Sequence, residues 1–261
     1  MSFKEWFFGE HDIINPGFEN PSIAGQWKLP HILVLLACIA TIVALALIFR
    51  KKSEKARRIV WWVLVGLIIL FEVTRRVKNT IRACVSGTTS LDDWLWIMLP
   101  RPWCAISCWS LIIAAIAKKK CLYNISSIMA LLCAIIFFAY PGVGFNSLYI
   151  YEFENIYSIF THSLLLVTSI TLITLKFTDF KYKSMWKELI CLGVIFLYAA
   201  LEILFKIEPD PLYFMPGGDI QDIFGFGYAA YLVVYLVFLT IFVNLFYLIN
   251  DRKSVFKKRK K

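Results

Sequence analysis

The sequence predicts an all-α protein, a polytopic bundle of seven helices that each cross a membrane. Hydrophobic residues make up 59% of the 261-residue chain and gather into long apolar runs. Twenty of the 28 Lys and Arg residues lie instead in four short segments, 50–58, 118–120, 176–187 and 252–261. Hydrocarbon cannot hydrogen-bond a bare peptide group, so a spanning segment has to be a helix of about 20 apolar residues. Apolar runs separated by short basic segments fit that requirement.

Seven segments have the length and composition of a spanning helix. The first is apolar except for a His at its head, and the second carries charged residues only in its last third. The third contains two prolines, the fourth and fifth are apolar with scattered hydroxyl and amide groups, the sixth has one Glu, and the seventh is aromatic-rich. They are Pro30–Phe49, Ile59–Val77, Asp93–Ala117, Cys121–Tyr140, Ile156–Thr174, Leu189–Phe205 and Phe226–Ile249.

The positions of the basic residues predict the orientation. Lys and Arg are retained on the cytoplasmic side of short loops, and here they fill the loops after the first, third and fifth segments and the C-terminal tail. The N-terminus is therefore expected outside and the C-terminus in the cytoplasm of a multi-pass plasma-membrane protein. The whole chain forms one integral membrane domain, with an outer segment (1–29), the bundle (30–249) and a basic cytoplasmic tail (250–261).

The net charge of +10 does not indicate nucleic-acid binding, because the basic residues are divided among loops and form no single stripe or reader motif. Anionic lipid at the cytoplasmic face is the expected partner of this charge. The seven cysteines do not form a disulfide framework, since all but Cys84 and Cys121 fall inside predicted spans. Cys84 is expected in an outer loop and Cys121 at a cytoplasmic boundary. The oligomeric state is left open.

Ionisable side chains inside a bilayer are costly and therefore mark candidate functional positions. In the predicted orientation they concentrate in the outer half of the spans, and the inner half holds almost none. This distribution predicts a polar cavity that opens to the outer face or outer leaflet. The residues concerned are His31, Glu72 with Arg75 and Arg76, Arg101, Cys104, His162 and Glu202.

Cys104 and His162 are expected at one depth. Cys104 precedes Lys118 by 14 residues, and His162 precedes Lys176 by the same 14. At about 1.5 Å per residue, both lie roughly 21 Å from the basic boundary. An imidazole beside a thiol can hold its proton and activate it as a nucleophile. The blander interpretation, a packed thiol and a hydrogen-bonded His, stays open, as does a weakly supported metal site that adds Cys108; no metal or cofactor is required.

Pro100 and Pro102 interrupt the third segment just before Cys104. Each proline removes a helical hydrogen bond and exposes a carbonyl one turn earlier, which is tolerated at membrane depth where the backbone lines a cavity or is buried in protein. Arg101 could hold an anionic group such as a lipid phosphate or an oxyanion, or could instead pair with Glu72. Glu72 and Arg76 also have the spacing of an ordinary i,i+4 ion pair.

The outer loop Glu208–Asp219 is rich in Pro and Gly with aromatic residues between them. Such a composition favours a compact structured lid over the cavity. A plain connector with interfacial aromatics explains it equally well.

Several of these positions together resemble a known family. They are the Leu-Pro-x-x-x-Cys element from Leu99 to Cys104, His31, Glu72, the Thr161-His162-Ser163 step and the Tyr-Phe-Met-Pro segment at Tyr213–Pro216. The pattern resembles the YwaF family of bacterial integral membrane proteins, which is similar to eukaryotic transmembrane protein 164. That resemblance implies an acyltransferase acting on ether phospholipids through a membrane-embedded Cys, here Cys104, with His162 as its partner and His31 as a further site residue. Many bacterial members carry a His where this chain has Pro102.

The sequence therefore predicts a lipid acyltransferase or acyl-ester hydrolase with a Cys104–His162 pair in an outward-facing cavity. Membrane lipids are the expected substrates, and the predicted substrate-binding residues are His31, Arg101, Glu72 and Glu202. The alternatives are a non-enzymatic small-molecule carrier or membrane subunit of a larger assembly, which would use the same cavity, and a scaffold whose basic tail binds a partner.

Overall fold

The computed structural model describes residues 25, 27–87, 91–101, 103–139, 145, 152–205, 225 and 227–257. These residues form eight α-helices and one 3₁₀ helix, and no strand occurs among them. The outer N-terminal segment before residue 25 and the candidate lid Glu208–Asp219 lie outside the described residues. In chain order the helices are α2 (Leu29–Phe49), α3 (Glu54–Val85), α4 (Leu91–Met98), α5 (Trp103–Ala117), α6 (Lys120–Ala139), α7 (Phe153–Thr174), η1 (Tyr182–Ser184), α8 (Met185–Leu204) and α10 (Tyr228–Lys257).

Every predicted span coincides with helix, and the third is split into α4 and α5 at the two prolines, as proline chemistry requires. Four helices are long and apolar enough by themselves to cross a membrane among the residues described: α2, α6, α7 and α10. The others do not qualify because α3 and α8 carry charged residues and α5 is short. The membrane character of the chain is thus supported, while the number of crossings remains a prediction.

Two boundary predictions were wrong. Helix α3 continues to Val85, so Cys84 lies in its last turn and not in a loop. Helix α8 begins at Met185, which places Glu188 inside the helix, where it is buried. The expectation that the inner half holds almost nothing ionisable fails at this residue.

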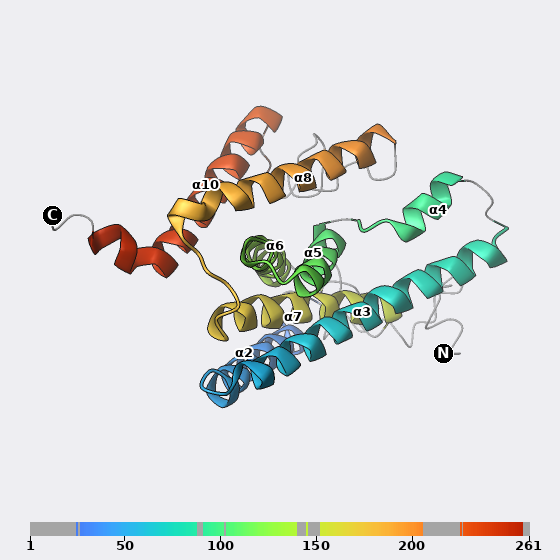
Figure 1. Ribbon diagram of the computed structural model, residues 1–261. Helices are drawn as coiled ribbons and strands as arrows, with labels where there is room; N and C mark the ends of the chain where they lie inside the picture. The colour runs from blue at the N-terminus through green and yellow to red at the C-terminus, as the bar shows by residue number, and fades with distance from the viewer. Residues whose placement is uncertain are drawn as a thin grey trace.

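Helix α6 occupies the centre of the bundle, with α5, α7 and α8 packed around it (Figure 1). Most of its residues are buried, whereas the large apolar side chains of α2 and α10 are mostly exposed. Helix α2 packs against α7, and helix α3 packs against both α5 and α7. Two long helices with apolar outer faces would be unstable in water, so these faces fit a lipid environment.

One end of the bundle gathers basic residues, and we name it the basic end after Arg57, Lys118–Lys120 and Lys176. Arg57 Nη1 donates to Leu175 O (2.7 Å), and Lys120 Nζ donates to Lys176 O (3.3 Å) and Phe177 O (2.7 Å). These cations bind carbonyls at the C-cap of α7 and just beyond it, near the helix end where the dipole favours positive charge. Lys118 and Lys176 both adopt positive φ, 55° and 64°, directly after α5 and α7.

A buried polar cluster ties α6 to the start of α8 near the basic end. The Asn124 amide donates to Glu188 Oε1 (2.7 Å) and to Asp179 O (3.0 Å), and its oxygen accepts from Asp179 N (2.9 Å). Asn124 and Glu188 are both buried. We call these residues the Asn124 network. Its bonds fix the turn between α7 and α8 against the central helix.

Candidate functional site

The Glu72 carboxylate is the centre of a network that joins three helices at the end opposite the basic end. Arg76 Nη1 donates to Glu72 Oε2 at 2.6 Å, Trp109 Nε1 donates to the same oxygen at 3.0 Å, and Tyr157 OH donates to Oε1 at 2.9 Å. Glu72 is only 3% exposed. Both carboxylate oxygens are hydrogen-bonded, which a buried charge needs if it is to be tolerated. We call these four residues the Glu72 network.

The predicted i,i+4 pair of Glu72 and Arg76 is therefore present, and the alternative pairing of Glu72 with Arg101 is wrong. Arg76 is the partner because it lies one turn along the same helix and reaches the carboxylate directly. Its guanidinium also lies over the Trp109 ring, 5.1 Å from the centroid. The pair thus belongs to the packing of α3 against α5.

The break between α4 and α5 exposes carbonyls that side chains of other helices satisfy. Met98 O, which would accept from residue 102 if that residue were not proline, accepts from Arg76 Nε at 3.1 Å. Pro100 O accepts from Tyr198 OH at 3.2 Å, and Arg101 O accepts from Arg75 Nη1 at 3.4 Å. Donors from α3 and α8 therefore hold the break in one conformation.

Arg101 and Glu202 lie on the α8 side of this break. The Tyr198 hydroxyl lies within hydrogen-bond distance of Glu202 Oε1 (2.9 Å) as well as of Pro100 O (3.2 Å), the residue before Arg101, so its single proton is shared between the two. Arg101 is 5% exposed and Glu202 1%. Two of the predicted substrate-binding residues are thus brought together through Tyr198, separately from the Glu72 carboxylate.

Cys104 is the second residue of α5, directly after the break. The first turn of a helix carries amides without intrahelical partners, and the helix dipole is positive there. Both features favour negative charge, and burial opposes it. The residue as a whole is partly exposed, and its side chain packs against the main apolar core where the chain enters α5.

His162 is held in a defined orientation on α7. Its ring stacks on Phe137 of α6 with a centroid separation of 3.9 Å and an interplanar angle of 8°. Its Nδ1 lies 2.7 Å from the carbonyl oxygen of Ser158. A neutral imidazole that donates from Nδ1 to a carbonyl leaves Nε2 as the proton-accepting nitrogen. That tautomer is the one a general base requires.

Cys104 and His162 both adjoin the apolar core to which α6 contributes. His162 stacks on Phe137 of α6, and Cys104 packs against the apolar cluster that includes Phe137 and Cys133. Their equal depth was counted from Lys118 and Lys176. The helix ends at these two residues lie next to each other, because Lys120 Nζ donates to Lys176 O. Among the described residues, the thiol and the imidazole make no hydrogen bond to each other.

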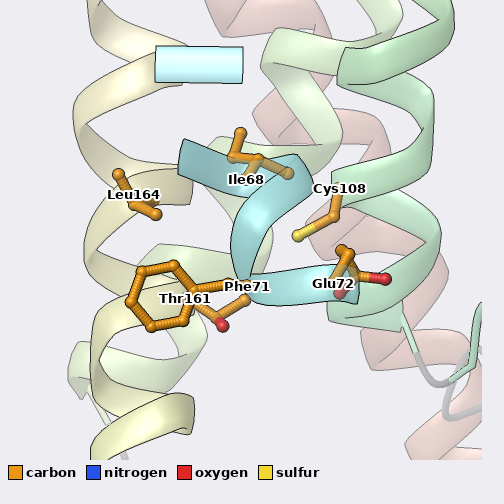
Figure 2. A pocket seen from close by; sticks show the side chains of 6 residues that line it. All are labelled: Ile68, Phe71, Glu72, Cys108, Thr161 and Leu164. Atoms are coloured by element: carbon orange, nitrogen blue, oxygen red, sulfur yellow. The ribbon is translucent and has the colours of Figure 1, made fainter. Parts of the chain in front are cut away.

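A narrow crevice runs between α3, α5 and α7 (Figure 2). Cys108, one turn after Cys104, and Thr161, next to His162, face it together with Glu72, and three apolar side chains complete its walls: Ile68, Phe71 and Leu164. The crevice is too narrow for a water molecule. Packed side chains therefore close this part of the polar cavity that the sequence predicts. Residues of α5 and α7 nevertheless line the same crevice.

His31 lies apart from the Glu72 network. It is completely buried, and Nδ1 accepts from the backbone N–H of Trp27 at 3.0 Å. Its ring stacks on Phe138 at 6.0 Å, and Phe138 contacts Phe137, on which His162 stacks. Two phenylalanines thus separate the two histidines. This surrounding is that of a packing residue at the start of α2.

Sequence reasoning missed Tyr157, Trp109 and Tyr198, which supply hydrogen bonds to Glu72, Glu202 and Pro100 O. Aromatic residues with a polar tip are common at membrane interfaces, so their type alone gave no signal. Lys78 was also missed: it is buried and forms an ion pair with Glu154 that joins α3 to α7. No group of three or more His, Cys, Asp or Glu among the described residues is arranged to hold a metal ion.

The apolar outer helices, the satisfied helix break and the buried polar network define an integral membrane helical bundle with a polar site between its helices. Comparison with known families agrees with this class. Residues 26–256 match the TMEM164 family, and the chain belongs to that family. The relationship to transmembrane protein 164 is thus confirmed at the family level, and membership of the YwaF family stays a prediction. No curated protein and no solved structure matches the chain.

Proposed function

We propose that this membrane protein transfers acyl chains between lipids, or cleaves them to water, through a thioester on Cys104. The observation that carries the proposal is the position of Cys104 at the start of α5, packed against the apolar core, together with that of His162, whose tautomer is fixed by Ser158 and whose ring stacks on Phe137 of the same core. Membership of the TMEM164 family adds support, because the resemblance to transmembrane protein 164 implies this chemistry.

All seven apolar units cross the membrane in this proposal, with the N-terminus outside and the basic end in the cytoplasm. The clustering of Arg57, Lys118–Lys120 and Lys176 at one end of the bundle supports the orientation, because basic loops are retained inside. Anionic lipid of the plasma membrane then faces the basic end. Cys104 and His162 lie nearer the outer leaflet, from which a lipid ester would enter.

Acyl transfer begins with His162 Nε2 taking the proton of the Cys104 thiol. The thiolate attacks the carbonyl carbon of a lipid ester, and the carbonyl electrons move to oxygen in a tetrahedral intermediate. When this intermediate collapses, the ester C–O bond breaks, and His162 gives its proton to the departing lyso-lipid oxygen. The product is a thioester on Cys104 and a neutral imidazole.

The second half returns the enzyme to its starting state. His162 takes the proton of a lyso-lipid alcohol or of water, whose oxygen attacks the thioester carbonyl. The C–S bond breaks, the thiolate regains the proton from His162, and an acylated lipid or a free fatty acid leaves. No oxidant or reductant is needed for this balance.

The proposal is tested by trapping the thioester. Purified protein in liposomes is incubated with a phospholipid that carries an isotope-labelled acyl chain, quenched in acid and digested, and the peptides are analysed by mass spectrometry. We expect the labelled acyl group on Cys104, removed by neutral hydroxylamine. Cys104→Ala should abolish labelling and transfer, and His162→Gln should lower both by about 100-fold or more.

Cys108→Ala is the matched control, because Cys108 lies one turn further along α5 and lines the crevice. It should keep labelling at Cys104. Retained acyl transfer in Cys104→Ala, or a folded wild-type protein that never acquires the acyl group, would overturn the proposal. The second result would leave a carrier or an assembly subunit as the better explanation.

A further inference from the structure

Two adjacent arginines of α3 have different surroundings. Arg76 forms an ion pair with Glu72, donates to Met98 O and lies over Trp109. Arg75 has no carboxylate within ion-pair distance among the described residues. Its one hydrogen bond there is a long one, to Arg101 O at 3.4 Å. The positive charge of Arg75 is therefore not neutralised by a direct partner.

The position of Arg75 is nevertheless well defined. Its guanidinium carbon lies 5.7 Å from the centroid of the Tyr157 ring, a cation–π arrangement. Its bond to Arg101 O directs the charge to the backbone that leads into α5, three residues before Cys104. The chain segment that Arg75 contacts is therefore the one that carries Cys104 into α5.

We propose that Arg75 is the cation that stabilises negative charge at Cys104. The charge resides first on the thiolate sulfur and then, if the proposed acyl transfer holds, on the carbonyl oxygen of the attacked ester. A preorganised cation in a site of low polarity is worth more than the same cation in water, because no solvent has to reorganise around the developing charge.

This assignment replaces the sequence-based role of Arg101. The side chain of Arg101 is associated with Tyr198 on the α8 side, and only its carbonyl oxygen takes part in the contact with Arg75. Other groups also act on the Cys104 thiol, and a test has to keep them in place: Glu72 of α3, Tyr157 of α7, Cys108 of α5 and Cys133 of α6.

The experiment measures the ionisation of Cys104 directly. The full chain, with all its cysteines kept, is alkylated in detergent with iodoacetamide between pH 6 and 11, and the rate at Cys104 is followed by tandem mass spectrometry of the peptide that contains it. Because only the thiolate reacts, the midpoint of the rate–pH curve reports the charge environment. Arg75→Gln should move this midpoint up by about one pH unit and slow alkylation at neutral pH by about tenfold. Arg75→Lys should recover part of the difference.

Arg76→Gln is the matched control. It removes a cation one residue away that is paired directly with Glu72, so it should lower the melting temperature and move the midpoint by clearly less than Arg75→Gln does. An unchanged midpoint in folded Arg75→Gln overturns the inference, as does an equal shift in Arg76→Gln. Alkylation requires no lipid substrate, so this result is independent of the thioester experiment: failure of acyl transfer alone would leave the role of Arg75 at the thiol intact.

Discussion

The Glu72 network and the Asn124 network lie toward opposite ends of the bundle. Their buried polar groups are stabilised by different kinds of partner. At Glu72 a full charge is matched by Arg76, with Trp109 and Tyr157 completing the shell. At Asn124 a neutral amide bonds to one carboxylate and to both polar groups of the Asp179 backbone. The amide network closes a turn. The charged network lies beside Cys104 and leaves Arg75 available to act on it.

The charged groups around the helix break lie on particular helices. The helices that fail the simple test for a membrane span, α3, α8 and the α4–α5 pair, hold Glu72, Glu202 and the proline break. The uniformly apolar helices α2 and α10 contribute none of these groups. Polar residues in a membrane are kept only where neighbours satisfy them. The interruptions of apolar sequence therefore identify where the helices meet around a site.

Removing the Glu72 carboxylate should have the largest effect. Glu72→Ala leaves the Arg76 guanidinium, the Trp109 N–H and the Tyr157 hydroxyl without their acceptor in a largely buried region. Breaking such a pair costs about 3–5 kcal/mol, which corresponds to a fall of roughly 10 °C in melting temperature measured in detergent. Glu72→Gln, which keeps an acceptor oxygen, should lose less. Equal melting temperatures for Glu72→Ala and wild type would refute the structural weight given to this network.

Breaking the Asn124 network should come second. Asn124→Ala removes three hydrogen bonds and leaves Glu188 and the Asp179 backbone unsatisfied, at a cost of about 2–3 kcal/mol in unfolding free energy. We expect this loss of stability to leave the Cys104 site unaffected, so the alkylation midpoint of Cys104 should stay unchanged in this variant. A shifted midpoint would mean that the two networks are coupled through α6.

The features of this fold that depend on neighbouring residues along the chain follow from the sequence. The contacts between different helices do not. Apolar length predicts the helices, and proline chemistry predicts the break before Cys104, because both depend on neighbours along the chain. The Glu72–Arg76 pair follows from its one-turn spacing. Tyr157 and Tyr198 do not follow, because a tyrosine reaches a buried carboxylate only if its helix is rotated toward it. That rotation is set by the packing of the helices and cannot be predicted from a single sequence.

The same reasoning explains the incomplete prediction of the candidate site. Equal distances from the basic boundary placed Cys104 and His162 at one depth, and depth says nothing about direction around a helix. Both residues adjoin the apolar core around α6, and no hydrogen bond joins them in the part of the chain that the structure describes. Glu188 was missed for a simpler reason: the predicted span began one residue after it, so a buried carboxylate was counted with the exposed boundary residues.

Tyr157→Phe should have a smaller effect than either network disruption. The substitution removes one hydroxyl donor from Glu72 and keeps the ring that packs on Phe71 and lies beneath Arg75. Loss of a single hydrogen bond to a charged acceptor costs about 1.5–3 kcal/mol, here toward the lower value because Glu72 keeps two donors. Thermal unfolding measures the loss. A loss as large as that of Glu72→Ala would show that Tyr157, and not Arg76, is the main partner of the carboxylate.

The smallest effect is expected at the exposed start of α3, where Arg58 donates to Glu54 Oε1 at 3.0 and 2.6 Å. This hydrogen bonding holds the pKa of the Glu54 carboxyl below its ordinary value of 4.5. Because the folded-state pKa is the lower one, the pair stabilises the folded protein above pH 4.5, and the contribution disappears as the pH falls through the folded value. Glu54→Gln should therefore differ only slightly from wild type near pH 7, and the melting temperatures should converge below about pH 4. The pair is solvated, so salt should weaken the difference as well. A large loss at neutral pH would show that an exposed pair at the basic end can matter as much as the buried Glu72 network, and the contrast between solvated and buried charges drawn here would fail.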